Sequence, residues 1–354
     1  MRILGRTTLR VPRIVLGAMA RRSSGDAERV ALFERAIEMG LTTFDTAPLY
    51  EFGGAERQLG QLLRRNGHDE IQILTKAGLR WDGAHGDVLF SFTDASGKRR
   101  EVRRDSRPEA LRLDVEGSLR RLGVDTLDLV QIHHRDRHTP IDESMGALLE
   151  LRAQGKLRFI GVSNFDANEI GQAAKALGNV PLCSVQPEYN LVRRGIEQEV
   201  LPTCQALGVG ILAYSPLAEG LLAGRPPPPG AWIPHRVHEA LRQVLQPMAE
   251  MRNASMAAVA LAWLVRRPGV TAAVAGVSTP EQLQGLVEAL QLRLDSEDVV
   301  ALEDAFGKEG LSDGWQREQG RRRRLLNRGK AALGAVIRSV GLEPSALRRK
   351  LRQR

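Results

Sequence analysis

Four polar residues lie at or just beyond the ends of short apolar segments: Asp45, Tyr50, Lys76 and His133. A carboxylate can hold a lysine ammonium in place, and an ammonium beside a phenol favours the phenolate, which lowers the tyrosine pKa from about 10. A tyrosine tuned in this way could donate a proton to a carbonyl oxygen as hydride arrives, and withdraw it in the reverse reaction. A histidine could orient that carbonyl by a hydrogen bond. A single residue of this kind is more often a solvated or structural side chain, so the set has meaning only if the fold brings the four together.

A regular alternation of short apolar segments with longer segments of helical periodicity runs from about residue 13 to residue 290. Eight such units can be counted, which is typical of parallel βα units. Their strands are expected at residues 14–16, 42–44, 72–75, 127–132, 157–162, 182–186, 210–214 and 271–275. A chain of 354 residues is long enough for a closed barrel of about 250 residues as one domain. The sequence therefore predicts an α/β fold, a (β/α)8 TIM barrel, in which residues that follow the strands meet at one mouth.

The starts of three helices carry their own sequence signals. Ser106 and Glu109 have the spacing of a capping box, with a proline between them in the first turn. Thr139 and Thr279 each precede a proline, the pattern of an N-cap followed by proline at the first helical position. We therefore expect helices to begin at these three places.

Three segments do not fit the repeating unit. Residues 80–104 make a long connection after the third strand, and their alternation around a turn signal predicts a hairpin over the barrel mouth. Residues 226–230, four prolines and a glycine, predict a stiff extended connector. The barrel pattern stops at about residue 307. We therefore expect a barrel domain at residues 1–307 and a basic C-terminal appendage at residues 308–354.

The formal net charge of +9 is concentrated in this appendage. Residues 321–354 hold twelve Lys and Arg against one acid, Glu343, so this segment carries +11 and the other 320 residues carry −2. Binding of nucleic acid is not expected of the barrel, and the lack of aromatic residues beyond Trp315 argues against base stacking by the appendage. An amphipathic basic helix there could touch a membrane surface weakly, and a solvated appendage is the simpler interpretation.

Composition excludes several other classes of protein. Hydrophobic residues make up 42% and charged residues 26%, as in ordinary globular proteins. The longest apolar run, residues 256–265, is about half a membrane span. Arg13 leaves about five apolar residues before Ala18, too few for a secretory signal. Cys183 and Cys204 provide neither a disulfide framework nor a metal cluster. A cytoplasmic protein without a metal is expected.

Several motifs together resemble the aldo-keto reductase superfamily: FDTAPLY, LTKAG, DLVQIHHRD, GKLRFIGVSNF, YSPLAEGLLAG and AGVSTPEQL. The resemblance runs from Leu4 to about Phe306. It implies a barrel that reduces aldehydes, ketones or aldoses with a nicotinamide cofactor. It also implies that Asp45, Tyr50, Lys76 and His133 form the catalytic set. His133 is preferred to the neighbouring His134, because the family's histidine directly follows the apolar pair.

The resemblance also implies where the cofactor would bind. Ser163, Asn164 and Gln186 would contact the carboxamide, and Tyr214 would stack on the nicotinamide ring. Ser215, Leu217, Gly220 and Arg225 would follow the pyrophosphate. Gly276, Ser278 and Gln282 would take the adenosine phosphate at a helix N-terminus.

The identity of this cofactor depends on two departures from the family pattern. NADPH is the implied cofactor, and NADH is the alternative, because many relatives have Arg or Lys where this chain has Ser278, and Asn where it has Leu286.

The substrate is weakly constrained by the sequence. Met19, Trp81 and Arg135 would line the mouth by their positions, and the FDTAPLY motif resembles members acting on aldoses and pyridoxal as well as general aldehyde reductases. The partner is expected to be a small carbonyl or alcohol. Two other functions stay open: a cofactor-binding redox sensor or partner subunit with little turnover, and an accessory protein acting through the basic appendage. The oligomeric state is unknown.

Overall fold

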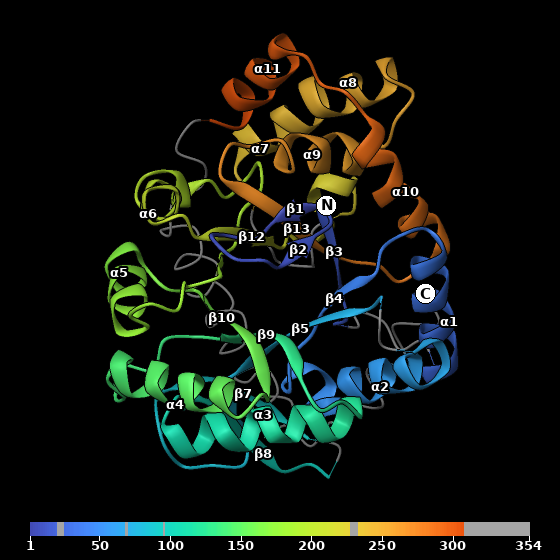
Figure 1. The fold of residues 1–354 in the computed structure, drawn as a ribbon. Coiled ribbons are helices and arrows are strands. Elements are labelled where there is room, and N and C mark those ends of the chain that lie inside the picture. The colour runs from blue at the N-terminus through green and yellow to red at the C-terminus, as the bar shows by residue number, and fades with distance from the viewer. Residues whose placement is uncertain (20–24, 68–69, 95, 227–232, 308–354) are drawn as a thin grey trace, which may run out of the picture.

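A closed barrel of eight parallel strands forms the centre of the molecule, and the helices surround it (Figure 1). The computed structural model describes residues 1–19, 25–67, 70–94, 96–226 and 233–307. The strands neighbour one another in the order β10-β11-β12-β13-β3-β4-β5-β9. Their bounds are β3 Ile14–Gly17, β4 Thr43–Asp45, β5 Gln72–Ala77, β9 Leu127–Ile132, β10 Leu157–Ser163, β11 Ser184–Gln186, β12 Gly210–Tyr214 and β13 Val270–Gly276. The predicted TIM barrel is confirmed, and every strand lies within two residues of its expected position.

The helices pack their apolar faces on the outside of the barrel, where a large buried core separates helices from strands. Their bounds are α1 Asp26–Glu38, α2 Gly54–Asn66, α3 Pro108–Leu122, α4 Ile141–Ala153, α5 Ala167–Ala176, α6 Val200–Leu207, α7 His235–Ala240, α8 Gln246–Met251, α9 Met256–Leu264, α10 Pro280–Gln291 and α11 Ser296–Phe306. Short 3-10 turns occupy Tyr50–Gly53, Gly195–Glu197 and Ala218–Ala223, and a π-helical turn at Leu241–Leu245 joins α7 to α8. None of the described helices is long and apolar enough to cross a membrane.

Two of the three predicted helix caps are wrong. Arg107 is the N-cap of α3, and no side chain caps the helix. Ser106 instead receives hydrogen bonds from the Ser144 hydroxyl on α4, so tertiary contacts use the group that a capping box would need. The Thr139 hydroxyl donates instead to Asp136 Oδ2, three residues earlier in the same loop, at 2.6 Å, and α4 begins one residue later than expected. The third cap is confirmed, because Thr279 Oγ1 accepts from the Gln282 amide.

Two hairpins lie outside the barrel sheet. The predicted hairpin is confirmed as β7 Val88–Thr93 and β8 Arg99–Arg104, and the short strand β6 Leu79–Arg80 pairs with β8 on its other side. The other hairpin, β1 Arg2–Ile3 and β2 Arg10–Val11, was not predicted. Its Leu4, Leu9 and Val11 join the apolar cluster inside the barrel.

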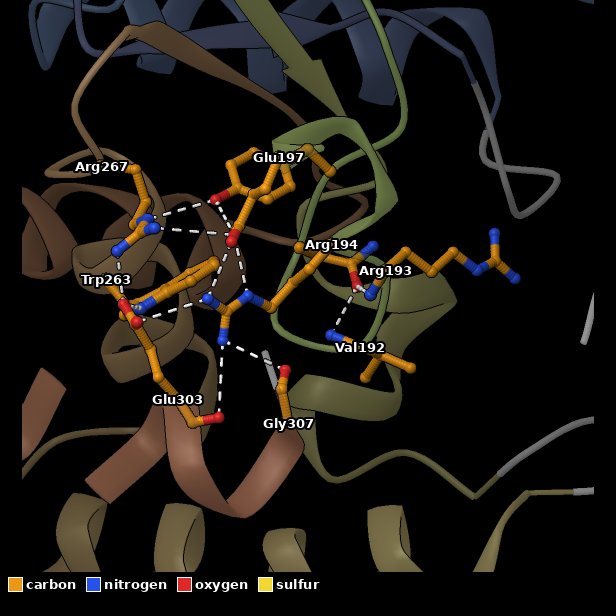
Figure 2. Close-up of polar contacts among 10 residues, drawn as sticks. Val192, Arg193, Arg194, Glu197, Trp263, Arg267, Glu303 and Gly307 are labelled. Carbon is orange, nitrogen blue, oxygen red and sulfur yellow. Dashed lines mark hydrogen bonds and ion pairs between the residues drawn. The ribbon is translucent and has the colours of Figure 1, made fainter. Parts of the chain in front are cut away.

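A buried polar network ties the loop after β11 to α9 and α11 (Figure 2). Arg194 is 2% exposed and donates to both carboxylate oxygens of Glu197, to Glu303 and to the Gly307 carbonyl. Arg267 pairs with the same two glutamates, and the guanidinium groups of both arginines lie against the Trp263 ring. The network anchors the end of α11. The predicted appendage and most of the predicted proline connector lie outside the described residues, so the division into two parts stays a prediction.

Candidate active site

Three neighbouring strands bring the four residues singled out by their chemistry to one end of the barrel. Asp45 is the last residue of β4, Lys76 the last but one of β5, and His133 the first after β9. β5 pairs with both β4 and β9 in parallel register, so the three side chains lie side by side. Tyr50 begins the 3-10 turn that leads from β4 to α2.

Lys76 lies at the centre of this group. Its ammonium donates to Asp45 Oδ1 at 2.6 Å, to the Thr46 carbonyl at 3.1 Å and to the Tyr50 hydroxyl at 3.2 Å. Lys76 is 1% exposed and Asp45 2%. Burial favours the neutral amine, but Asp45 and Tyr50 outweigh it and raise the pKa of Lys76. The ammonium is therefore charged, and its three N–H groups are all used.

The pKa of Tyr50 differs in direction from the sequence-based expectation. Burial raises it above the ordinary value of 10.0, and Lys76 offsets this only in part. Lys76 lowers the Tyr50 pKa as predicted, but the predicted net lowering toward working pH is wrong, because desolvation of the phenolate outweighs the attraction of the ammonium. The phenol therefore stays protonated at neutral pH, with the Lys76 ammonium 3.2 Å from its oxygen.

His133 faces Tyr50 and is uncharged. The two rings meet edge to face, with centroids 5.9 Å apart. Burial, Lys76 and His134 all lower the pKa of His133 well below 6.5. A neutral imidazole carries one N–H, so His133 can donate a single hydrogen bond without adding charge.

A cavity of about 530 Å³ opens beside these residues. Asp45, Tyr50 and His133 line part of it. The remaining wall contains all of the residues expected at the cofactor: Ser163, Asn164, Gln186, Tyr214, Ser215, Leu217, Gly220, Arg225, Gly276, Ser278 and Gln282. The fold thus brings the two predicted sets to one cavity.

The three residues expected at the substrate do not all meet there. Met19 lines the cavity. Trp81 lines a separate cavity of about 270 Å³ and packs edge to face on Phe52, with ring centroids 5.3 Å apart. Arg135 donates to the Thr139 carbonyl at 2.7 Å and is not among the lining residues. Trp81 therefore faces the second cavity, and Arg135 is held within the loop between β9 and α4.

Comparison with known proteins identifies the family of this chain. The model of the aldo/keto reductase family matches residues 13–306. The chain belongs to the aldo/keto reductase family. It is accordingly an NAD(P)H-dependent oxidoreductase.

Similar enzymes of this family cover nearly the whole chain. The NADH-specific methylglyoxal reductase of Escherichia coli K12 is 30% identical over 85% of this chain and 96% of its own. The L-glyceraldehyde 3-phosphate reductase of Escherichia coli O157:H7 is 31% identical over 89% and 94%. Among solved structures, the glycerol dehydrogenase of Gluconobacter oxydans has a TM-score of 0.74 and 31% identity, covering 87% of this chain and 95% of its own.

In this aldo/keto reductase, Asp45 also connects the polar group around Lys76 to the cavity wall. Its second oxygen, Oδ2, accepts from Gln186 Nε2 at 2.8 Å. The Gln186 backbone carbonyl accepts in turn from the Ser163 hydroxyl at 2.8 Å and from the backbone N–H of Asn164 at 3.2 Å. The Tyr214 hydroxyl donates to Asn164 Oδ1 at 2.9 Å. One hydrogen-bonded chain therefore runs from Lys76 to Tyr214.

Three residues of the cavity wall have left-handed backbone conformations. Asn164, Ser215 and Glu219 line the cavity, and each has a positive φ: 58°, 50° and 60° respectively. Such conformations are unfavourable for residues other than glycine and persist only where the surroundings enforce them. The cavity wall is therefore shaped at a cost in local stability.

The lining also includes residues to which the sequence analysis gave no role, and two of them, His134 and Glu281, carry polar side chains. His134 stacks on His133, and its Nε2 lies 3.3 Å from Asn164 Nδ2. Glu281 lies in the first turn of α10 beside Ser278. For His134, the only sequence signal was its position next to His133. For Glu281, it was the position at the start of a predicted helix. The described residues contain no group of three or more His, Cys, Asp or Glu that could hold a metal ion.

Proposed function

We propose that this enzyme transfers hydride between a nicotinamide cofactor and the carbonyl carbon of an aldehyde, ketone or aldose, with Tyr50 as the general acid. The contact that carries the proposal is the buried Lys76 ammonium, 2.6 Å from Asp45 and 3.2 Å from the Tyr50 hydroxyl. Asp45 and Tyr50 both line the large cavity. A protonated phenol with a fixed cation behind it can give its proton to a carbonyl oxygen as negative charge develops there.

Each of the four residues has one task in this reaction. Tyr50 holds the proton at its hydroxyl and donates it to the substrate oxygen. Lys76 stabilises the phenolate that remains, and Asp45 keeps the ammonium in place and charged. His133 donates its single N–H to the same substrate oxygen and orients it. The cofactor, when bound, supplies the hydride.

The cavity wall fits a nicotinamide dinucleotide. Gln186 is 2% exposed, and its Oε1 receives no hydrogen bond from the described residues, so an acceptor is available for a carboxamide N–H. Ser163 and Asn164 lie beside it, and the Tyr214 ring is placed to pack on the nicotinamide. We assign the pyrophosphate to Ser215, Leu217, Gly220 and Arg225. The adenosine phosphate belongs with Gly276, Ser278 and Gln282, at the start of α10, where an anion is favoured.

The enzyme is further proposed to use both NADPH and NADH. The resemblance to the family points to NADPH. Residues 276–286 contain no Arg or Lys to clamp a 2′-phosphate, and Glu281 adds a negative charge to the lining. We therefore expect less than about 10-fold discrimination in kcat/KM, equivalent to about 1.4 kcal/mol.

The test is the loss of nicotinamide absorbance with NADPH and, separately, NADH, on a panel of short aldehydes, ketones and aldoses. Methylglyoxal and L-glyceraldehyde 3-phosphate belong on the panel, because relatives are named for them. We expect turnover with both cofactors. Tight cofactor binding without turnover of any substrate would instead favour the redox sensor or partner subunit.

A further inference from the structure

We propose that the second cavity, beside the turn that begins at Tyr50, is a binding site for a small carboxylate with an apolar body, such as an aryl-substituted acetate. Its volume is about 270 Å³, and none of the described residues lines both it and the large cavity. Pro48, two residues before Tyr50, forms part of its wall. Trp81, which also lines it, packs on Phe52 of the same turn. The site therefore lies against the Tyr50 segment, outside the proposed active site.

The charges of the lining favour an anion. Three arginines and two aspartates give the cavity a formal charge of +1: Arg80, Arg120, Arg121, Asp82 and Asp114. Arg80 bridges the two aspartates, because it donates to Asp82 at 2.7 and 3.0 Å and to Asp114 Oδ1 at 2.8 Å. Burial also raises the pKa of Asp114 to about 7, so part of its negative charge is lost at neutral pH. Arg120 and Arg121 supply the positive charge that is left over.

Arg121 is held with part of its guanidinium unused. Its Nε donates to Glu56 Oε2 at 2.6 Å, and its Nη2 lies 3.4 Å from Ser118 Oγ. Its Nη1 donates to no described residue. The guanidinium lies over Gly117, which also lines the cavity, since a Cβ at that position would come 2.8 Å from Nη1. A glycine inside a helix costs about 1 kcal/mol relative to alanine, so α3 is weakened at the point that leaves room for this group.

Two further donors line the cavity. Arg120 is exposed, and its acidic neighbour Glu116 is already paired with Lys156 at 2.7 Å. The indole N–H of Trp81 has no acceptor among the described residues. A carboxylate accepts hydrogen bonds at both of its oxygens and pairs well with guanidinium groups. The unused donors of the lining therefore match a carboxylate.

The size and the apolar part of the lining set the body of the ligand. Trp81 contributes its ring, and Pro48 and Leu113 contribute aliphatic surface. Leu113 is 54% exposed although its side chain is large and apolar, so a ligand body covers surface that water now contacts. Ligand pockets usually measure about 300–1,000 Å³, and this cavity lies just below that range. It therefore suits a ligand with about one ring.

The experiment is isothermal titration calorimetry of the full-length protein with phenylacetate as the probe. Phenylacetamide has the same shape without the charge, and acetate keeps the charge without the ring. We expect phenylacetate to bind with a Kd of about 1 mM or tighter. Each of the other two compounds should bind at least about 10-fold more weakly, through the loss of a charged hydrogen bond or of a buried ring.

Two variants with matched controls place the probe in this cavity. Gly117→Ala puts a methyl group where the Arg121 guanidinium lies and should weaken phenylacetate binding about five-fold or more. Gly146→Ala in α4 is its control, because a Cβ there meets nothing within 4 Å. Arg120→Met should weaken binding about two- to five-fold, the range of an exposed ion pair. Arg112→Met, on the same helix but not in the lining, should keep the wild-type affinity.

The large cavity is the other place where the probe could bind. His133 lines that cavity and not the second one, so His133→Gln should bind phenylacetate as the wild type does. Arg121 itself is left in place, because the fully buried Glu56 depends on it. Urea unfolding checks that each variant is folded, and the exposed Arg120 keeps the test open if Gly117→Ala is unstable.

Four results would overturn the proposal. These are no binding of phenylacetate up to about 10 mM, equal affinity for phenylacetate and phenylacetamide, wild-type affinity in folded Gly117→Ala or in Arg120→Met, and a loss of about five-fold or more in His133→Gln. The last result would place the probe in the large cavity.

Discussion

Replacing Arg194 by methionine should destabilise the fold by about 3 kcal/mol. The side chain is 2% exposed and makes its best hydrogen bonds, 2.8 and 2.9 Å, with the two carboxylate oxygens of Glu197 (Figure 2). It also donates to Glu303 Oε2 at 3.3 Å and to the Gly307 carbonyl at 3.2 Å. Methionine keeps most of the apolar stem and removes all of these donors.

The magnitude follows from what remains after Arg194 is removed. Breaking a buried ion pair costs about 3–5 kcal/mol when the other charge is left without a partner. Here Glu197 keeps the Tyr189 hydroxyl at 2.6 Å and Arg267 at 3.6 Å, and Glu303 keeps Arg267 and the Trp263 indole N–H. Neither carboxylate is isolated, so we place the loss at the lower end of that range.

Urea unfolding at pH 7.5, followed by tryptophan fluorescence and circular dichroism, measures this loss as a lower midpoint at unchanged slope. Arg158→Met is the control, because Arg158 is 66% exposed and pairs with Asp128 at the surface, where ion pairs contribute less than about 1 kcal/mol. Equal midpoints for Arg194→Met and the wild type would refute the reasoning.

The ion pair between Arg194 and Glu197 also makes the stability of the fold depend on pH. Burial opposes ionisation of Glu197, but the hydrogen bonds from Arg194 and Tyr189 outweigh it and lower the Glu197 pKa below 4.5. A carboxyl group with a depressed pKa in the folded state stabilises the fold above its unfolded pKa. This stability is lost as pH falls through the folded value. The difference between wild type and Arg194→Met should therefore narrow below about pH 4.5.

Three further predictions concern the active site. Lys76→Met should lower kcat/KM by about 10²- to 10⁴-fold, because the phenolate loses its cation, with NADPH affinity nearly unchanged in calorimetry; activity within about 10-fold of wild type would contradict this. The pH profile of carbonyl reduction should be flat between about pH 5.5 and 9, because His133 is neutral and Tyr50 protonated across that range; a titration near pH 6.5 that disappears in His133→Gln would show otherwise. Ser278→Arg should raise the NADPH-to-NADH ratio of kcat/KM by about 10-fold or more through a new charged hydrogen bond, and an unchanged ratio would place the 2′-phosphate elsewhere.

The sequence predicts the barrel well because its signals are local. Each strand is a short apolar segment bounded by helical periodicity, and the ends of three such segments place Asp45, Lys76 and His133. The two wrong caps fail for the opposite reason. Ser106 and Thr139 have suitable neighbours along the chain, but Ser106 is bound by Ser144 of another helix, and the Thr139 hydroxyl donates to Asp136 in the preceding loop.

The features of the site that the sequence did not predict depend on contacts between residues far apart in the chain. Asp45 and Gln186 are 141 positions apart, and no spacing rule connects them. The direction of the Tyr50 pKa shift depends on how completely the site is buried, which the sequence does not reveal. Trp81 and Arg135 were placed by position after their strands, whereas their side-chain directions depend on Phe52 and Thr139.

The most direct test of the central claim is a single-turnover measurement of hydride transfer by Tyr50→Phe, with NADPH affinity measured on the same preparation. Single-turnover rates report on chemistry even where product release limits steady-state turnover. We predict that hydride transfer slows by about 10²- to 10⁴-fold, while the NADPH Kd stays within about two-fold of wild type. Hydride transfer at the wild-type rate with unchanged NADPH affinity would contradict the assignment of Tyr50 as the proton donor.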